Sequence, residues 1–238
     1  MRTLYKARSI ITMNDSLPRA TAVLVQDGMI LEVGDAENMQ PWLQHQDYVV
    51  DEQFADKIIC PGFIDPHLHP SMAAVLLPME FITAMRWKLP WGEIAPVTDP
   101  QGFDARLAVL NQEKAAAEPL FIWGYHQLWH GPMSRQRIES IAGERPTVVW
   151  HRSFHELYMN AAAMDMVGVV AADIKPGMQI NIEHGHFYEG GLGYAINRLN
   201  PWILAPDKYA AGLQRLKAVV HYGGHTSIGD LATGMFNF

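Results

Sequence analysis

The chain has 238 residues, of which 49% are hydrophobic and 18% charged, so it has enough apolar material for a folded core and is not an intrinsically disordered protein. Its formal net charge is −7 and its lysines and arginines form no cluster, which argues against a nucleic-acid groove or an anionic membrane surface as partner. The single cysteine, Cys60, excludes an internal disulfide, and the sequence shows neither a bilayer-spanning apolar run nor a signal-peptide pattern, so we expect a cytoplasmic protein.

The pattern of residues 1–57 predicts a small β-rich domain that forms part of a β-sandwich. The dipeptide Asp27-Gly28 separates two apolar runs and suits a tight hairpin turn whose central residues have positive φ. Asp35 is placed to cap a short helix. The expected elements, in order, are two strands, the helix and a third strand, at residues 22–26, 29–33, 35–43 and 48–51.

Residues 58–238 carry the pattern of an α/β domain. Apolar, β-branched runs alternate with helical stretches, which favours a parallel sheet with helices outside it, and the clearest helix runs from Asp207 to Tyr222. Strands are expected at residues 58–69, 120–125, 147–150 and 225–228. A (β/α)8 barrel of the TIM-barrel type has twice as many strands and takes about 250 residues, so the sequence predicts only the first half of such a barrel.

The segment His67-Leu68-His69 ends the first of these strands. Because side chains alternate along a strand, both imidazoles point to the same side. Imidazole is the commonest protein ligand for zinc, and a catalytic zinc site has about three protein ligands with one position open for water. The two histidines therefore predict half of a metal site, with Asp65 placed to orient an imidazole.

Three segments of the chain resemble a known family. Residues 61–69 read Pro-Gly-Phe-Ile-Asp-Pro-His-Leu-His, which is similar to the first barrel strand of the amidohydrolase superfamily of metal-dependent hydrolases. Residues 145–164 resemble the segment "RPV…GHxxWVNSxAL" of one branch, which includes N-substituted formamide deformylases. Residues 226–230, Thr-Ser-Ile-Gly-Asp, resemble that branch's "GVTSVHD" strand.

This resemblance implies a metal-dependent hydrolase that cleaves the C–N bond of an amide, formamide or cyclic amide with a metal-activated water. It implies one or two divalent ions, zinc being the first choice, held by His67 and His69. Two further histidines and the proton-shuttling, catalytic aspartate of the family would lie beyond Phe238. The expected partners are a small-molecule substrate and, because an unclosed parallel sheet leaves an unpaired edge, further copies of the chain in a homo-oligomer.

Four more side chains are candidates for a substrate pocket. His155 matches the histidine of the family's "GHxxWVN" segment. Trp123, His126 and Asp230 lie in or after predicted strands, and the loops at the carboxyl ends of barrel strands build the pocket in this architecture. Core packing is the alternative role for the tryptophan, solvation for His126, and helix capping for the aspartate.

Glu189 is a possible bridging carboxylate between two metal ions, because the resemblance places a glutamate near this part of the chain. The alternative register moves that glutamate position to Tyr194 and leaves no bridging carboxylate in the stretch. Close by, His184-Gly185-His186 is a second His-x-His. It lies among glycines, which predicts a loop or ribbon rather than a barrel strand.

Two alternative interpretations remain. Cupins also hold metal with a His-x-His on a strand, but their pattern has a glutamate a few residues after the second histidine, and the nearest here is Glu80. In the other alternative, the chain has the fold of this family but does not catalyse the reaction. In that case the chain is a non-catalytic half-barrel that lacks the later metal ligands and the catalytic aspartate.

Overall fold

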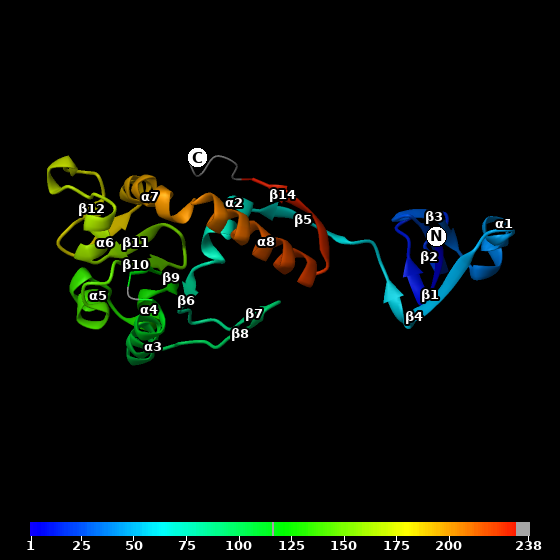
Figure 1. Cartoon of the computed structure of the whole chain (residues 1–238), viewed down its shortest axis with the longest axis horizontal. Coiled ribbons are helices and arrows are strands. Elements are labelled where there is room, and N and C mark those ends of the chain that lie inside the picture. Colours follow the sequence, from blue (N-terminus) through cyan, green and yellow to red (C-terminus); the bar gives the residue numbers. More distant parts are fainter. Residues whose placement is uncertain (116, 232–238) are drawn as a thin grey trace. The chain divides into compact units, whose positions relative to one another are not determined.

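The computed structural model describes residues 1–115 and 117–231, which are shown in Figure 1. The chain divides into two compact units, Met1–Phe63 and Ile64–Phe238, and each is described by itself. The boundary between the units follows Phe63, whereas the sequence predicted a boundary after residue 57. No helix within the described ranges is both long and apolar enough to cross a membrane.

The first unit is built on a four-stranded sheet with the order β3-β2-β1-β4. Strand β1 pairs antiparallel with β2 and parallel with β4, and β2 pairs antiparallel with β3. A short 3-10 helix, η1, and helix α1 follow β3 and contribute Met39 and Leu43 to the core. The elements are β1 (Arg2–Ile11), β2 (Arg19–Gln26), β3 (Met29–Gly34), η1 (Ala36–Met39), α1 (Gln40–Leu43) and β4 (Tyr48–Ile59).

The structure confirms the predicted hairpin, since Asp27 and Gly28 join β2 to β3 with φ of 51° and 81°. The predicted cap is wrong. The Asp35 carboxylate accepts no hydrogen bond from the helix that follows it and instead accepts one from the Thr21 hydroxyl at 2.8 Å. The unit has one sheet within the described residues, so the second layer of a β-sandwich stays a prediction.

In the second unit, β5 (Phe63–Leu68) and β14 (His225–Asp230) form a two-stranded sheet. The Leu231 backbone N–H donates to the Leu68 carbonyl at 3.3 Å, and a Cβ added to Gly229 would lie 2.8 Å from the Pro66 carbonyl oxygen. Partner numbers rise together on the two strands, so the pair is parallel, as their arrows in Figure 1 also show.

Helix α2 (Pro70–Leu76) follows β5, and helix α8 (Pro206–Tyr222) precedes β14. The two helices pack against each other: the Tyr209 hydroxyl donates to the Ser71 hydroxyl at 3.2 Å, and the Arg215 guanidinium donates to the Leu77 carbonyl at 2.7 Å. Two parallel neighbouring strands and the two helices between them therefore form one β-α-α-β unit. Everything between α2 and α8 is inserted into it.

The inserted segment forms a six-stranded mixed sheet with the order β12-β13-β11-β10-β9-β6. The three strands β6, β9 and β10 are parallel, whereas β11, β12 and β13 join by antiparallel pairing. The strands of this sheet are β6 (Glu80–Phe81), β9 (Leu120–Tyr125), β10 (Thr147–His151), β11 (Glu156–Met159), β12 (Ile180–Asn181) and β13 (His186–Tyr188). The remaining elements are β7 (Trp87–Leu89), β8 (Gly92–Ile94), α3 (Pro100–Glu113), α4 (Gln127–His130), α5 (Arg135–Ala142), α6 (Ala161–Met166), η2 (Ala171–Asp173) and α7 (Gly190–Ile203).

Hydrophobic cores cover both faces of this sheet, because successive residues of β10 point to opposite sides. Val149 packs with Phe103 of α3 and Ile138 of α5 in one core. Val148 and Trp150 belong to the other core, which helix α7 covers. A sheet buried on both faces accounts for the continuous apolar runs at residues 120–125 and 147–150.

The prediction that four strands form one parallel half-barrel sheet is wrong. The first and fourth predicted strands, β5 and β14, pair with each other, while the second and third, β9 and β10, lie in the inserted sheet. An apolar, β-branched run identifies a strand but carries no information on its partner. The β5–β14 pair and the β9–β10 pair each have the parallel adjacency that a barrel requires of consecutive strands, but they lie in separate sheets.

Candidate functional site

His67 and His69 lie at the carboxyl end of β5, and their imidazole rings contact each other edge to face with centroids 5.1 Å apart. The Asp65 carboxylate accepts a hydrogen bond from the His67 backbone N–H at 3.0 Å. This local turn fixes the strand end. The observed contact of Asp65 is therefore with the backbone, whereas the sequence predicted that it orients an imidazole.

The Nδ1 atom of His69 is buried, and within the described residues it has no hydrogen-bond partner. A buried polar nitrogen without a partner is costly, and such an atom calls for a bound water, an ion or a functional role. A metal ion fits this nitrogen together with the neighbouring imidazole of His67. Within residues 1–115 and 117–231, no three histidine, cysteine or acidic side chains are grouped to hold a metal, so the fit is that of a partial site.

Asp230 ends β14 and lies beside the carboxyl end of β5, because the Leu231 and Leu68 backbones are hydrogen-bonded. The pairing of the two strands therefore brings one sequence-predicted pocket residue into the neighbourhood of the histidine pair. The other candidates lie in the inserted sheet.

Trp123 is a core residue with 8% of its surface exposed. Its ring lies edge to face against Phe81 and Trp87, with centroids 5.2 and 5.4 Å away. His155 and Glu189 form a surface pair, in which Nδ1 and Oε2 are 3.4 Å apart and the side chains are 69% and 58% exposed. The roles of His155 in substrate binding and of Glu189 in bridging two ions stay predictions.

His126 begins helix α4, where its Nδ1 accepts a hydrogen bond from the Leu128 backbone N–H at 3.2 Å. Its ring lies 4.9 Å from that of His151, the last residue of β10. His151 in turn leads to a cluster that sequence reasoning missed, in which His186 Nε2 lies 2.5 Å from Glu156 Oε2. The second His-x-His is thus part of a ribbon, as predicted, and its second histidine contacts a carboxylate.

Burial sets the protonation states around this cluster. It lowers the pKa of His151, although the Glu156 carboxylate opposes this effect. Burial also lowers the pKa of His126, to which the charge of Arg152 adds. It raises the pKa of Tyr125 to about 12. At neutral pH the two histidines are therefore uncharged and the tyrosine keeps its proton.

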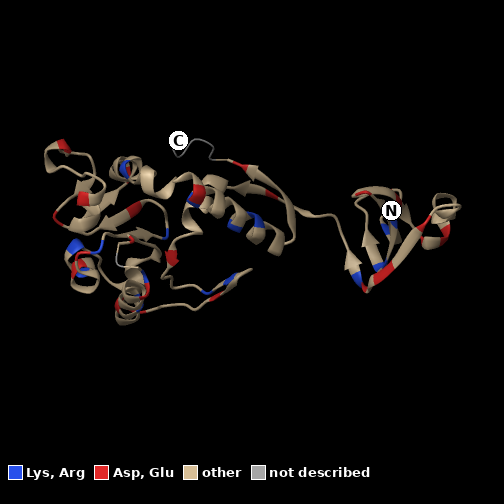
Figure 2. Ribbon diagram, in the orientation of Figure 1, with Lys and Arg blue, Asp and Glu red and all other residues tan. Residues whose placement is uncertain are grey.

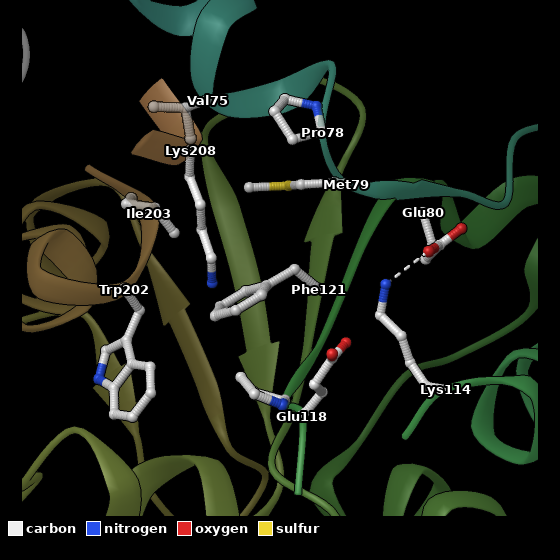
Figure 3. A pocket seen from close by; sticks show the side chains of 11 residues that line it. Val75, Pro78, Met79, Glu80, Lys114, Glu118, Phe121, Trp202, Ile203 and Lys208 are labelled. Atoms are coloured by element: carbon white, nitrogen blue, oxygen red, sulfur yellow. Dashed lines mark hydrogen bonds and ion pairs between the residues drawn. The ribbon is translucent and has the colours of Figure 1, made fainter. Parts of the chain in front are cut away.

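A separate cavity of about 350 Å³ lies at the amino end of β9, where Glu118 and Pro119 precede the strand (Figure 3). Its walls are mostly apolar, and the Lys208 ammonium reaches toward the ring of Phe121. Another lysine is neutralised, since Lys114 pairs with Glu80 at 2.8 Å. The cavity is lined by Val75, Pro78, Met79, Glu80, Lys114, Glu118, Pro119, Phe121, Trp202, Ile203 and Lys208. Neither histidine of the β5 pair lines it.

No family model matches the chain. The chain is 26% identical over 248 residues to the exoenzymes regulatory protein AepA of Pectobacterium carotovorum subsp. carotovorum, which covers 96% of the chain and 49% of that protein. It is 23% identical over 231 residues to protein LONG AFTER FAR-RED 3 of Arabidopsis thaliana, covering 94% of the chain and 37% of that protein.

Two solved structures superpose on almost the whole chain. An uncharacterized metal-dependent hydrolase from Pyrococcus horikoshii matches with a TM-score of 0.72 and 18% identity over 98% of this chain and 43% of its own. One from Pyrococcus furiosus matches with a TM-score of 0.69 and 18% identity over 98% and 44%. The chain spans at most about half the length of each of these relatives. It therefore shares the fold of a part of these two metal-dependent hydrolases.

Proposed function

We propose that this chain provides the first two metal ligands, His67 and His69, of a metal-dependent hydrolase. The observation that carries this proposal is the buried Nδ1 of His69, which has no partner within the described residues and lies beside a second imidazole. The fold shared with metal-dependent hydrolases supports it. We propose zinc as the ion, because two imidazoles at a strand end suit it.

A bound divalent ion would supply a water of near-neutral pKa and polarise a substrate carbonyl. The residues of the chain have distinct tasks. His67 and His69 hold the ion, Asp65 fixes the backbone at His67, and Asp230 lies beside the site on the neighbouring strand. Two ligands are fewer than the three of a catalytic zinc site, so the remaining ligands and the proton shuttle would come from outside the described residues.

For the reaction, we propose hydrolysis of the C–N bond of an amide, formamide or cyclic amide. The similarity of residues 61–69 and 145–164 to the amidohydrolase superfamily and its formamide deformylase branch supports this choice. A screen of N-substituted formamides, simple amides and cyclic amides, read out as released amine or carboxylate, tests it. Hydrolysis of ester substrates alone would contradict it.

The metal site is tested without activity, by titrating the chain with Co²⁺ and following its visible absorption and binding heat. We expect His69→Asn and His67→Asn each to weaken binding at least tenfold. The matched control is His184→Asn, from the other His-x-His, which should leave the affinity unchanged. Equal Co²⁺ affinity in the parent and in His69→Asn would overturn the site.

A further inference from the structure

A second cavity, of about 400 Å³, lies at the carboxyl ends of the parallel strands β9 and β10. We call it the Glu156 pocket. It is lined by Tyr125, Gln127, Pro132, Met133, Glu156 and Tyr158. In open α/β sheets, ligands bind in crevices outside the carboxyl ends of the strands, so this cavity is at the end of the sheet where a small molecule is expected.

The Glu156 carboxylate is the charged group of the pocket, and its side chain is 22% exposed. Its Oε2 atom accepts hydrogen bonds from His186 Nε2 at 2.5 Å and from the Tyr158 hydroxyl at 3.4 Å. Its Oε1 atom is 3.9 Å from His151 Nε2, which is beyond hydrogen-bonding distance. Within the described part of the chain, Oε1 thus accepts no hydrogen bond and is available to a ligand.

His151 does not supply the missing donor, because both of its nitrogens are engaged. The Ser153 backbone N–H lies 3.1 Å from Nδ1, so Nδ1 is an acceptor and the ring proton is on Nε2. That proton points to the side-chain oxygen of Gln127 at 3.0 Å. Burial lowers the pKa of His151, so the ring carries no charge that would neutralise the carboxylate at neutral pH.

The walls of the pocket are aromatic and apolar. The Tyr125 and Tyr158 rings lie edge to face with centroids 5.7 Å apart, and the imidazole of His186 stacks on Tyr158 at 4.3 Å. Burial raises the pKa of both tyrosines, which keeps their hydroxyls neutral. Arg137, whose charge opposes the rise in the pKa of Tyr125, is held by Asp104 at 2.7 Å. No lysine or arginine lines the cavity.

We propose that the Glu156 pocket binds a small organic cation, an alkyl or benzyl amine in its ammonium form. The ammonium donates to Glu156 Oε1, and charge-assisted hydrogen bonds of this kind are about twice as strong as neutral ones. The ring of Tyr158, which is partly exposed whereas Tyr125 is buried, attracts the cation. The hydrocarbon part packs against Pro132 and Met133. Nothing in this site involves His67 or His69.

The first test compares two probes on the unmodified 238-residue chain in the presence of a chelator, by calorimetric and NMR titration. We expect n-butylammonium to bind at least tenfold more tightly than n-butanol, its neutral isostere. Because the chelator removes metal, binding under these conditions is independent of the proposed hydrolytic site. Equal affinity for the two probes would overturn the proposal, and this comparison needs no variant that might misfold.

The second test uses Glu156→Gln, which keeps the size of the side chain and removes its charge. We expect at least a tenfold loss of n-butylammonium affinity and no change for n-butanol. The matched control is Glu189→Gln, which alters another glutamate paired with a histidine, at an exposed position. Tyr158→Leu should weaken ammonium binding about threefold, as expected for one lost cation–π contact. Unchanged ammonium affinity in Glu156→Gln would contradict the site.

Discussion

Gly212 of α8 lies directly against the backbone of Ala74 in α2, so that a Cβ added to Gly212 would overlap the Ala74 carbonyl group, 2.7 Å from its carbon. The two helices that connect β5 to β14 thus touch backbone to backbone. A side chain as small as a methyl group at this position must push them apart.

We predict that Gly212→Ala destabilises the chain by about 1–3 kcal/mol, because overpacking outweighs the gain in helix propensity. The matched control is Gly193→Ala in α7, where an added Cβ meets nothing within 4 Å. The control should be neutral or stabilising by up to about 1 kcal/mol. Urea unfolding measures both, and a Gly212→Ala variant as stable as the parent would disprove the contact.

Asn160 is fully buried, and we predict that Asn160→Ala costs about 2–4 kcal/mol. Its side-chain oxygen accepts from the backbone N–H groups of Thr147 and Ala163, each at 3.0 Å, and its amide donates to the Arg145 carbonyl at 2.7 Å. Asn160→Asp should also destabilise, because a carboxylate cannot donate to that carbonyl. Chemical unfolding would refute this role if either variant kept the parent stability.

Arg145 ties the end of α3 to the turn before β10. Its guanidinium donates to the Asn111 side chain at 2.5 Å and to the carbonyls of Ala115 and Glu118 at 2.6 and 2.7 Å. We predict that Arg145→Lys loses about 1–3 kcal/mol, since an ammonium cannot reproduce the planar fork of donors. Thermal and urea unfolding measure the loss. Arg137→Lys serves as a comparison, because Arg137 also donates to several acceptors, and it should lose a similar amount of stability.

Stability should fall as the pH drops below about 6.5, because burial lowers the pKa of His130 and His151 from that ordinary value. In this pH range the two histidines are protonated in the unfolded chain but not in the folded chain. The free energy of unfolding therefore decreases until the pH reaches the pKa values of the folded state. His130 is fully buried and its Nε2 donates to the Val97 carbonyl at 2.8 Å. Urea unfolding at pH 7.5 and 5.5 should show a smaller pH dependence in His130→Gln, and an unchanged dependence would contradict this origin.

Local patterns predicted local structure well. The Asp27-Gly28 turn, strand β9 at residues 120–125 and helix α8 near residues 207–222 appear where their sequences indicate. Each of these depends on residues that are near in sequence.

Features that depend on distant partners were not predictable in this way. Strands β11 and β13 are four and three residues long, too short for a periodic signal, and their pairing brings Glu156 to His186. The partner of β5 is β14, more than a hundred residues later, although β9 is nearer in sequence. The alternation of strands and helices favoured one parallel sheet because it cannot show where a second sheet is inserted.

Helix α2 begins at Pro70, directly after its N-cap residue His69, and buries Val75 in the core that also contains Trp150 and Leu199. This short helix therefore connects the second histidine to the core of the larger sheet. Mutations in that core, far from β5 in sequence, would shift α2 and change the position of the His69 imidazole relative to that of His67. Packing against the inserted sheet thus bears, through α2, on the position of His69.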